Sequence, residues 1–298
     1  MVTIASPPTP EAVLRRLEWR VLRRLDGRLQ GDYRTLLHGS GIDVADLREY
    51  VPGDDVRHID WNVTARTDVP HVRTYLEDRE LTAWLLLDRS ASMAFGPTER
   101  PKEVVLTEIA TALARLLTRG GNLVGAILFN NAVERTLPPR NGRNHVLRLT
   151  RELQRPTAST GSVTDLGGLI GAGLQTIRRR SLVVIVSDFI TEPGWERPLA
   201  MLSRRHDVVA IRLYDPREHE LPDAGLIVVE DAETGELLSV DTSDPEFRRR
   251  YHDVARARDA EMLGAAARAR VDLHSVSTED DLVAALVRIV ELRRRRRR

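Results

Sequence analysis

Cysteine is absent from the 298-residue sequence, which excludes disulfide bonds and thiolate-ligated metal sites. Apolar residues never form the run of about 20 that a membrane-spanning helix needs. Residues 1–20 also lack the long apolar stretch of a signal peptide. These absences predict a cytoplasmic protein with no integral membrane segment.

Lysine is nearly absent as well. Lys102 is the only lysine, and the rest of the 45 lysines and arginines are arginines. A phosphate-binding P-loop needs Gly-Lys-Ser/Thr, and Lys102 lies between Pro101 and Glu103, so that nucleotide motif is excluded. The formal net charge of +1 falls to −5 without the six C-terminal arginines. A mildly acidic body does not support a broad nucleic-acid surface, and we expect no nucleic-acid partner.

Changes in composition divide the chain into four segments. Residues 1–30 carry apolar groups at helical spacing and predict an N-terminal helix over 11–29. Residues 31–80 are rich in glycine, aspartate and arginine and predict a small loop-rich subdomain. Residues 81–292 form the predicted main domain. Residues 293–298 are expected to be a solvated arginine tail, with contact to acidic partners as the alternative.

The loop-rich subdomain contains both acidic and apolar residues. Its carboxylates alternate with arginines, which favours ion pairs and turn caps over a metal site; they are Asp43, Asp46, Asp54, Asp55 and Asp60. Trp61 is interpreted as a packing anchor. The number of apolar side chains predicts that residues 31–80 pack against the main domain as a fixed module.

The main domain alternates strands with helices. Apolar runs predict strands at 84–88, 123–129, 133–137, 182–186, 208–213 and 271–276, and a hairpin over 226–240. Helical spacing predicts helices at 102–119, 142–154, 165–179, 244–269 and 278–292, the last with Ser277 and Asp280 as a capping box. This alternation predicts the α/β class: a doubly wound, mostly parallel sheet with helices on both faces.

Oxygen-bearing side chains follow the strands of this predicted sheet. Asp88 ends one buried run and Asp188 ends another, and ligands of doubly wound sheets bind at the carboxyl ends of the strands. The loop after Asp88 adds the hydroxyls of Ser90 and Ser92, and Thr164 opens a helix at the same rim. An all-oxygen set of this kind suits Mg²⁺ or Mn²⁺.

The same residues carry a family resemblance. Asp88-Arg-Ser-Ala-Ser92, Thr164-Asp-Leu-Gly and Ser187-Asp188 resemble the metal-ion-dependent adhesion site (MIDAS) of von Willebrand factor A domains. The resemblance implies that Asp88, Ser90, Ser92, Thr164 and Asp188 hold the ion and that one coordination position is left for an acidic residue of a partner protein.

A second resemblance lies upstream. The segment from Arg48 to Trp61, with Thr64-Ala-Arg66, resembles the signature of the bacterial domain-of-unknown-function family 58. This family joins such a segment to an A-type domain and is often encoded near MoxR-type AAA+ ATPases. The resemblance implies a metal-dependent adaptor that works with such an ATPase in protein assembly or maturation.

Two other functions remain open from the residues. Haloacid-dehalogenase-type phosphatases also use an aspartate after the first strand, but they need a second one two residues on, where this chain has Ser90. We therefore expect no enzymatic activity, with metal-dependent phosphoester hydrolysis as the alternative. The second alternative is a structural assembly protein with an empty metal site.

For the adaptor, we expect Asp188→Ala to abolish partner binding and leave the fold intact, because the site would lie at the rim.

Overall fold

The protein divides into two compact units, one of residues 38–80 and one of residues 1–37 with 81–298. They are described from a computed structural model that covers residues 8–18, 46–52, 54, 56, 59–74, 81–97, 99–157, 164–230 and 236–296. In these ranges no helix is both long enough and apolar enough to cross a membrane.

The smaller unit is a strand pair with one short helix. Strands β1 (Asp46–Glu49) and β2 (His71–Thr74) pair antiparallel, and helix α4 (Trp61–Thr67) precedes β2. The Asp60 carboxylate accepts hydrogen bonds from the backbone N–H groups of Asn62 and Val63 at 3.0 and 3.3 Å, which caps α4. Asp54 forms an ion pair with Arg48 at 2.6 Å. Asp60 and Asp54 therefore serve as a cap and an ion-pair partner, as predicted.

Two further expectations concern this unit. Trp61 is 69% exposed on the first turn of α4, so it is not a packing anchor within the smaller unit. Asp43 and Asp55 lie outside the described residues. Packing of the segment 31–80 against the main domain stays a prediction.

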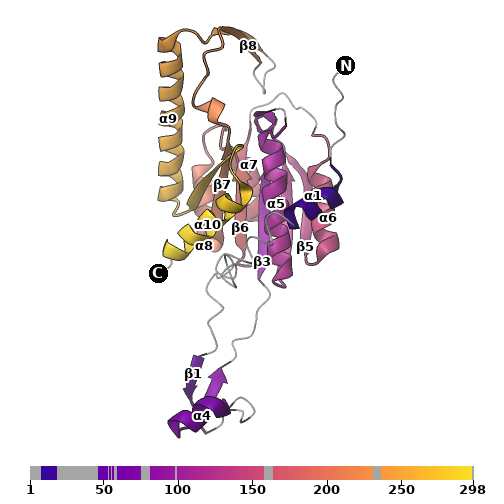
Figure 1. The fold of residues 1–298 in the computed structure, drawn as a ribbon, viewed down its shortest axis with the longest axis vertical. Coiled ribbons are helices and arrows are strands. Elements are labelled where there is room, and N and C mark those ends of the chain that lie inside the picture. Colours follow the sequence, from indigo (N-terminus) through magenta and orange to yellow (C-terminus); the bar gives the residue numbers. More distant parts are fainter. Residues whose placement is uncertain are drawn as a thin grey trace. The chain divides into compact units, whose positions relative to one another are not determined.

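The larger unit is built on a six-stranded sheet of order β10-β7-β6-β3-β4-β5 (Figure 1). Its strands are β3 (Thr82–Asp88), β4 (Leu123–Phe129), β5 (Val133–Arg140), β6 (Leu182–Ser187), β7 (Asp207–Tyr214) and β10 (Asp272–Ser277). All neighbouring strands are parallel except the edge pair β4 and β5. From β3 the chain first adds β4 and β5 on one side, and then β6, β7 and β10 on the other. This order confirms the predicted doubly wound α/β fold.

Helices cover both faces of the sheet because successive strand residues point to opposite sides. One face packs against α1 (Pro10–Leu17), α5 (Lys102–Arg119), α6 (Arg143–Leu153) and α10 (Leu282–Arg296), through strand residues such as Leu85 and Leu87. The other packs against α7 (Leu166–Thr176), α8 (Glu196–Arg205) and α9 (Pro245–Arg268), through Trp84 and Leu86. Trp84 needs Gly125 beside it, because a Cβ there would lie 2.8 Å from the indole.

Most predicted elements of this unit form where expected. Helix α5 begins and ends at the predicted residues, and the hairpin consists of β8 (Leu226–Glu230) and β9 (Leu237–Asp241). Helix α8 was not predicted. The predicted capping box forms, with Ser277 N–H bound to the Asp280 carboxylate at 3.1 Å, but it closes a turn before α10. The helix is capped instead by Asp281, which accepts from Ala284 N–H at 2.9 Å.

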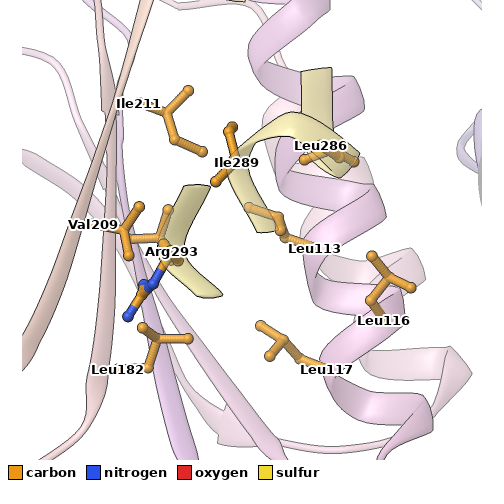
Figure 2. Close-up of a pocket in the computed structure, with 10 residues that line it drawn as sticks. Leu113, Leu116, Leu117, Leu182, Val209, Ile211, Leu286, Ile289 and Arg293 are labelled. Carbon is orange, nitrogen blue, oxygen red and sulfur yellow. The ribbon is translucent and has the colours of Figure 1, made fainter. Parts of the chain in front are cut away.

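The predicted arginine tail begins inside α10. Arg293 is 3% exposed and its Nη2 lies 2.9 and 2.8 Å from the two carboxylate oxygens of Asp207 at the start of β7. Figure 2 shows its side chain among apolar residues of α5, α10 and the sheet, beside a small cavity. The expectation of a solvated tail is therefore wrong for Arg293, whose charge is neutralised by a strand residue.

The N-terminal helix is part of this larger unit. Val13, Leu14 and Leu17 of α1 are buried in the same core as α5 and α6. The carboxylate of Glu18 accepts from Arg115 Nε of α5 at 2.9 Å, and Arg16 pairs with Glu108 of the same helix. The predicted helix beyond residue 18 lies outside the described residues.

Candidate metal centre

The two predicted aspartates come together at the centre of the sheet. Strands β3 and β6 are parallel neighbours, with Leu87 opposite Val186, so Asp88 at the end of β3 lies beside the residues that end β6. Both carboxylates are 1% exposed. This is the switch point of the sheet, because β4, which follows β3 in the chain, pairs with the edge of β3 that faces away from β6.

Hydrogen bonds from Ser90 and Ser187 hold Asp88 in place. Its Oδ1 accepts from the backbone N–H of Ser90 at 2.9 Å, and its Oδ2 accepts from the Ser187 hydroxyl at 2.6 Å. Burial, followed by the nearby charge of Asp188, raises the pKa of Asp88 to about 6. The ionised form of Asp88 is thus unfavourable without a full counter-charge, and a cation beside the carboxylate would stabilise it.

The serine hydroxyls lie next to this carboxylate. Ser90 and Ser92 are buried, and their Oγ atoms are 3.1 Å apart across the first turn of the short 3₁₀ helix η3 (Ala91–Ala94). Thr164 is 2% exposed and its carbonyl accepts from the Thr191 hydroxyl at 2.7 Å, which joins it to the loop after β6. The structure thus groups Asp88, Ser90, Ser92 and Asp188; the role of the Thr164 side chain stays a prediction.

Asp188 has a partner that the sequence did not indicate. The Lys102 ammonium, at the start of α5, lies 2.7 Å from Oδ2 of Asp188 and 2.5 Å from Oε1 of Glu218. Glu218 ends the 3₁₀ helix η4 (Pro216–Glu218), which follows β7. The expectation that Asp188→Ala would leave the fold intact is not supported, because Asp188 is an ion-paired buried residue and not a rim residue.

The loop that follows Asp188 has a strained backbone. Phe189 adopts the left-handed conformation with φ of 60°, which is unfavourable for a residue with a side chain. Its N–H donates to Ser187 Oγ at 3.0 Å, and its ring packs edge-on against Trp195 with centroids 5.5 Å apart. These contacts hold the loop in a conformation that turns the chain sharply after β6.

A cleft of about 750 Å³ opens beside Asp88 and Ser90. It is bounded by residues of α1, η3, α5 and the end of α6, and side chains of both charges line it, among them Arg16, Arg89 and Glu103. Arg89 is fixed there by Glu134, with Nη1 to Oε2 at 2.6 Å. Among the described residues, the cleft thus reaches two members of the site, Asp88 and Ser90.

The donor set fits a hard divalent cation. Asp88, Asp188 and Glu218 with Lys102 carry a formal charge of −2 when all four are ionised, which one divalent ion would neutralise. In the described part of the chain, no three histidine, cysteine, aspartate or glutamate side chains converge as metal ligands. An ion here would therefore depend on the serine hydroxyls and on water for the rest of its shell.

Three residues of the site escaped prediction. Lys102 had a signal, because it is the only lysine in an arginine-rich chain. Ser187 precedes Asp188 at a strand end and could have been found as a neighbour of Asp88 once β3 and β6 were paired. Glu218 had no local signal, because it meets Lys102 across 116 residues of sequence.

Comparisons with known proteins agree with the predicted family. The sequence profile described as "Protein of unknown function DUF58" matches residues 46–261. "Uncharacterized protein Rv1480" of Mycobacterium tuberculosis is 41% identical over 289 residues, which cover 97% of this chain and 91% of that protein.

Solved structures offer more distant likenesses. An aerotolerance-related membrane protein from Bacteroides fragilis has a TM-score of 0.49 and 15% identity, covering 72% of this chain and 99% of that one. The SpRpn10 VWA domain has a TM-score of 0.36 and 15% identity, covering 70% of this chain and 93% of that one. Both scores are low, so the fold class rests on the strand order described above.

Proposed function

Because the chain belongs to DUF58, a family of unknown function, we propose a function from the site itself: metal-dependent binding of a partner protein. The observation that carries the proposal is the meeting of Asp88 and Asp188 with two serine hydroxyls at the switch point, beside an open cleft. Mg²⁺ or Mn²⁺ held there would supply a positive charge to which a partner carboxylate can bind.

The chain's own residues would prepare that encounter. Ser187 and the N–H of Ser90 orient the Asp88 carboxylate, and Arg89 fixes the loop between the two ligand residues. The cleft lies over η3 and the start of α5 and offers a path for the polypeptide that carries the acidic residue. We further propose a MoxR-type AAA+ ATPase as the partner class, on family resemblance, because the chain lacks a P-loop motif of its own.

A pull-down from the native lysate tests this function. Wild-type protein should retain a partner with Mg²⁺ and lose it with EDTA, and Asp88→Asn should lose it in both. Asp215→Asn is the matched control, because Asp215 is also a buried carboxylate after a strand, bonded to the Thr278 hydroxyl at 2.6 Å. A partner retained equally well in EDTA would rule out metal-dependent recognition, and absence of a MoxR-type ATPase from the retained proteins would rule out that partner class.

Wild-type protein and the Asp88→Asn variant also test the enzymatic alternative. Both Asp88 carboxylate oxygens already accept hydrogen bonds from the chain, which does not favour a free nucleophile. We expect no metal-dependent hydrolysis of p-nitrophenyl phosphate by wild type above the level of Asp88→Asn. Hydrolysis that needs both Mg²⁺ and Asp88 would replace the adaptor function with a phosphoester hydrolase.

A further inference from the structure

Lys102 occupies a position that is unfavourable for a cation in two ways. Its side chain is 0% exposed, and transferring an ammonium from water into the protein interior is costly. It is also the first residue of α5, where the helix dipole places partial positive charge. This position holds the only lysine of the chain, and its ammonium is more compact than the guanidinium of an arginine.

The compensation comes from two carboxylates. Lys102 Nζ contacts Asp188 and Glu218, and it also lies 5.8 Å from the centroid of the Phe95 ring. These two contacts replace the water that the ammonium loses on burial, so the geometry of the pocket favours the charged form of Lys102.

Glu218 depends on this ammonium. Its Oε2 is buried and has no hydrogen-bond partner in the described part of the chain, and its Oε1 is bound by Lys102. The nearby guanidinium of Arg212 is paired with Asp259 at 2.7 Å. Glu218 thus helps to hold the Lys102 ammonium beside Asp188.

We propose that Lys102 is a built-in competitor of the divalent ion for Asp188. The inference rests on the proposed function and concerns its regulation. The ammonium already binds Oδ2 of Asp188, and the backbone N–H of Ile190 binds Oδ1 at 3.0 Å. An incoming ion must share this carboxylate with Lys102 and is repelled by its charge, so the free protein binds the ion weakly.

Weak binding in the free protein gives the partner a decisive role. A partner carboxylate adds a negative charge to the shell of the ion and offsets the repulsion from Lys102. The ion and the partner then each strengthen the binding of the other, and the coupling is reciprocal. Lys102 thereby makes the complete assembly, and not the ion alone, the stable state.

Calorimetric titration with Mg²⁺ tests the inference in the full chain. The double variant Lys102→Met/Glu218→Gln removes the ammonium together with the carboxylate that would be left uncompensated. We expect it to bind Mg²⁺ at least about tenfold more tightly than wild type, because a unit positive charge near the ion is gone. Glu218→Gln alone keeps the ammonium and should show no such gain. Lys102→Gln, whose amide can still donate hydrogen bonds, is the second variant if the double variant does not fold.

The outcomes separate this inference from the proposed function. Tighter binding by the folded lysine variants supports the inference. If wild type shows no binding and the variants bind, Lys102 blocks the ion in the free protein, which supports the inference, and the pull-down in Mg²⁺ and in EDTA decides the metal-dependent function. If wild type binds and the folded variants bind no more tightly, Lys102 is a structural residue and only the inference is overturned. If neither binds, both are overturned.

Discussion

The ammonium of Lys102 lies 2.7 Å from the Asp188 carboxylate, and neither side chain has any exposed surface. The two residues are 86 positions apart and join the start of α5 to the end of β6. Through this contact the candidate metal centre is also part of the folded core. Substitutions at the site therefore need a stability measurement beside each binding measurement.

Lys102→Arg should destabilise the protein although it keeps the charge. The pocket encloses a compact ammonium between Asp188 and Glu218, and a guanidinium needs more volume and a different donor geometry. Overpacking of this kind costs about 2 kcal/mol. Urea unfolding measures the effect, with Arg249→Lys at an exposed position as the control. A loss no larger than that of the control would show that the pocket does not discriminate between the two cations.

Arg293→Met should lower the free energy of unfolding by about 2 kcal/mol, because it removes the ion pair between the buried Arg293 guanidinium and Asp207. Figure 2 shows that the Arg293 side chain lies against apolar residues, so methionine keeps most of the packing. Arg288→Met on the same helix is the control, because that side chain is 51% exposed beside Asp280 and should contribute under about 1 kcal/mol. Equal losses would mean that the Asp207 contact does not anchor α10.

His274 should make the fold less stable as the pH falls below 6.5. Burial, followed by the charges of Arg293 and Arg288, lowers the pKa of His274 to about 4. Between pH 6.5 and 4 the unfolded chain therefore binds more protons at this residue than the folded chain, and stability rises with pH across that window.

His274→Gln should flatten this dependence, by about 2 kcal/mol between pH 7 and pH 5. His206 and His145, whose pKa values are also lowered by burial, leave part of the dependence in place. Urea unfolding at the two pH values gives the comparison, with His252→Gln as the more exposed control. A pH dependence unchanged by His274→Gln would show that this residue ionises without affecting the fold.

The sequence predicts what local patterns encode. Apolar runs locate β3 and β6, and the aspartates that end them locate the site once the strands are assumed to be neighbours. Helix α8 escapes because it is short and contains Pro198, which a helix tolerates only near its start. Its core contacts, Leu199 and Leu202, are too few for a clear helical period.

Contacts between distant segments cannot be read from such patterns. Nothing near Lys102 in the sequence indicates that it enters the core, since a lysine at the start of a helix is ordinarily solvated. Arg293 shows the same limit, because an arginine expected in a solvated tail is buried. Residue type gives a preference, and the tertiary partner decides the outcome.

The central claim is that Asp88 and Asp188 hold a divalent ion, and calorimetric titration of the whole chain with Mn²⁺ tests it most directly. Asp88→Asn and Asp215→Asn make the same chemical change at two carboxylates that are each 1% exposed, and only the first belongs to the proposed site. We predict one site in wild type, the same affinity in Asp215→Asn, and loss of binding in Asp88→Asn with the fold retained. Equal Mn²⁺ binding by wild type and a folded Asp88→Asn protein would contradict the account.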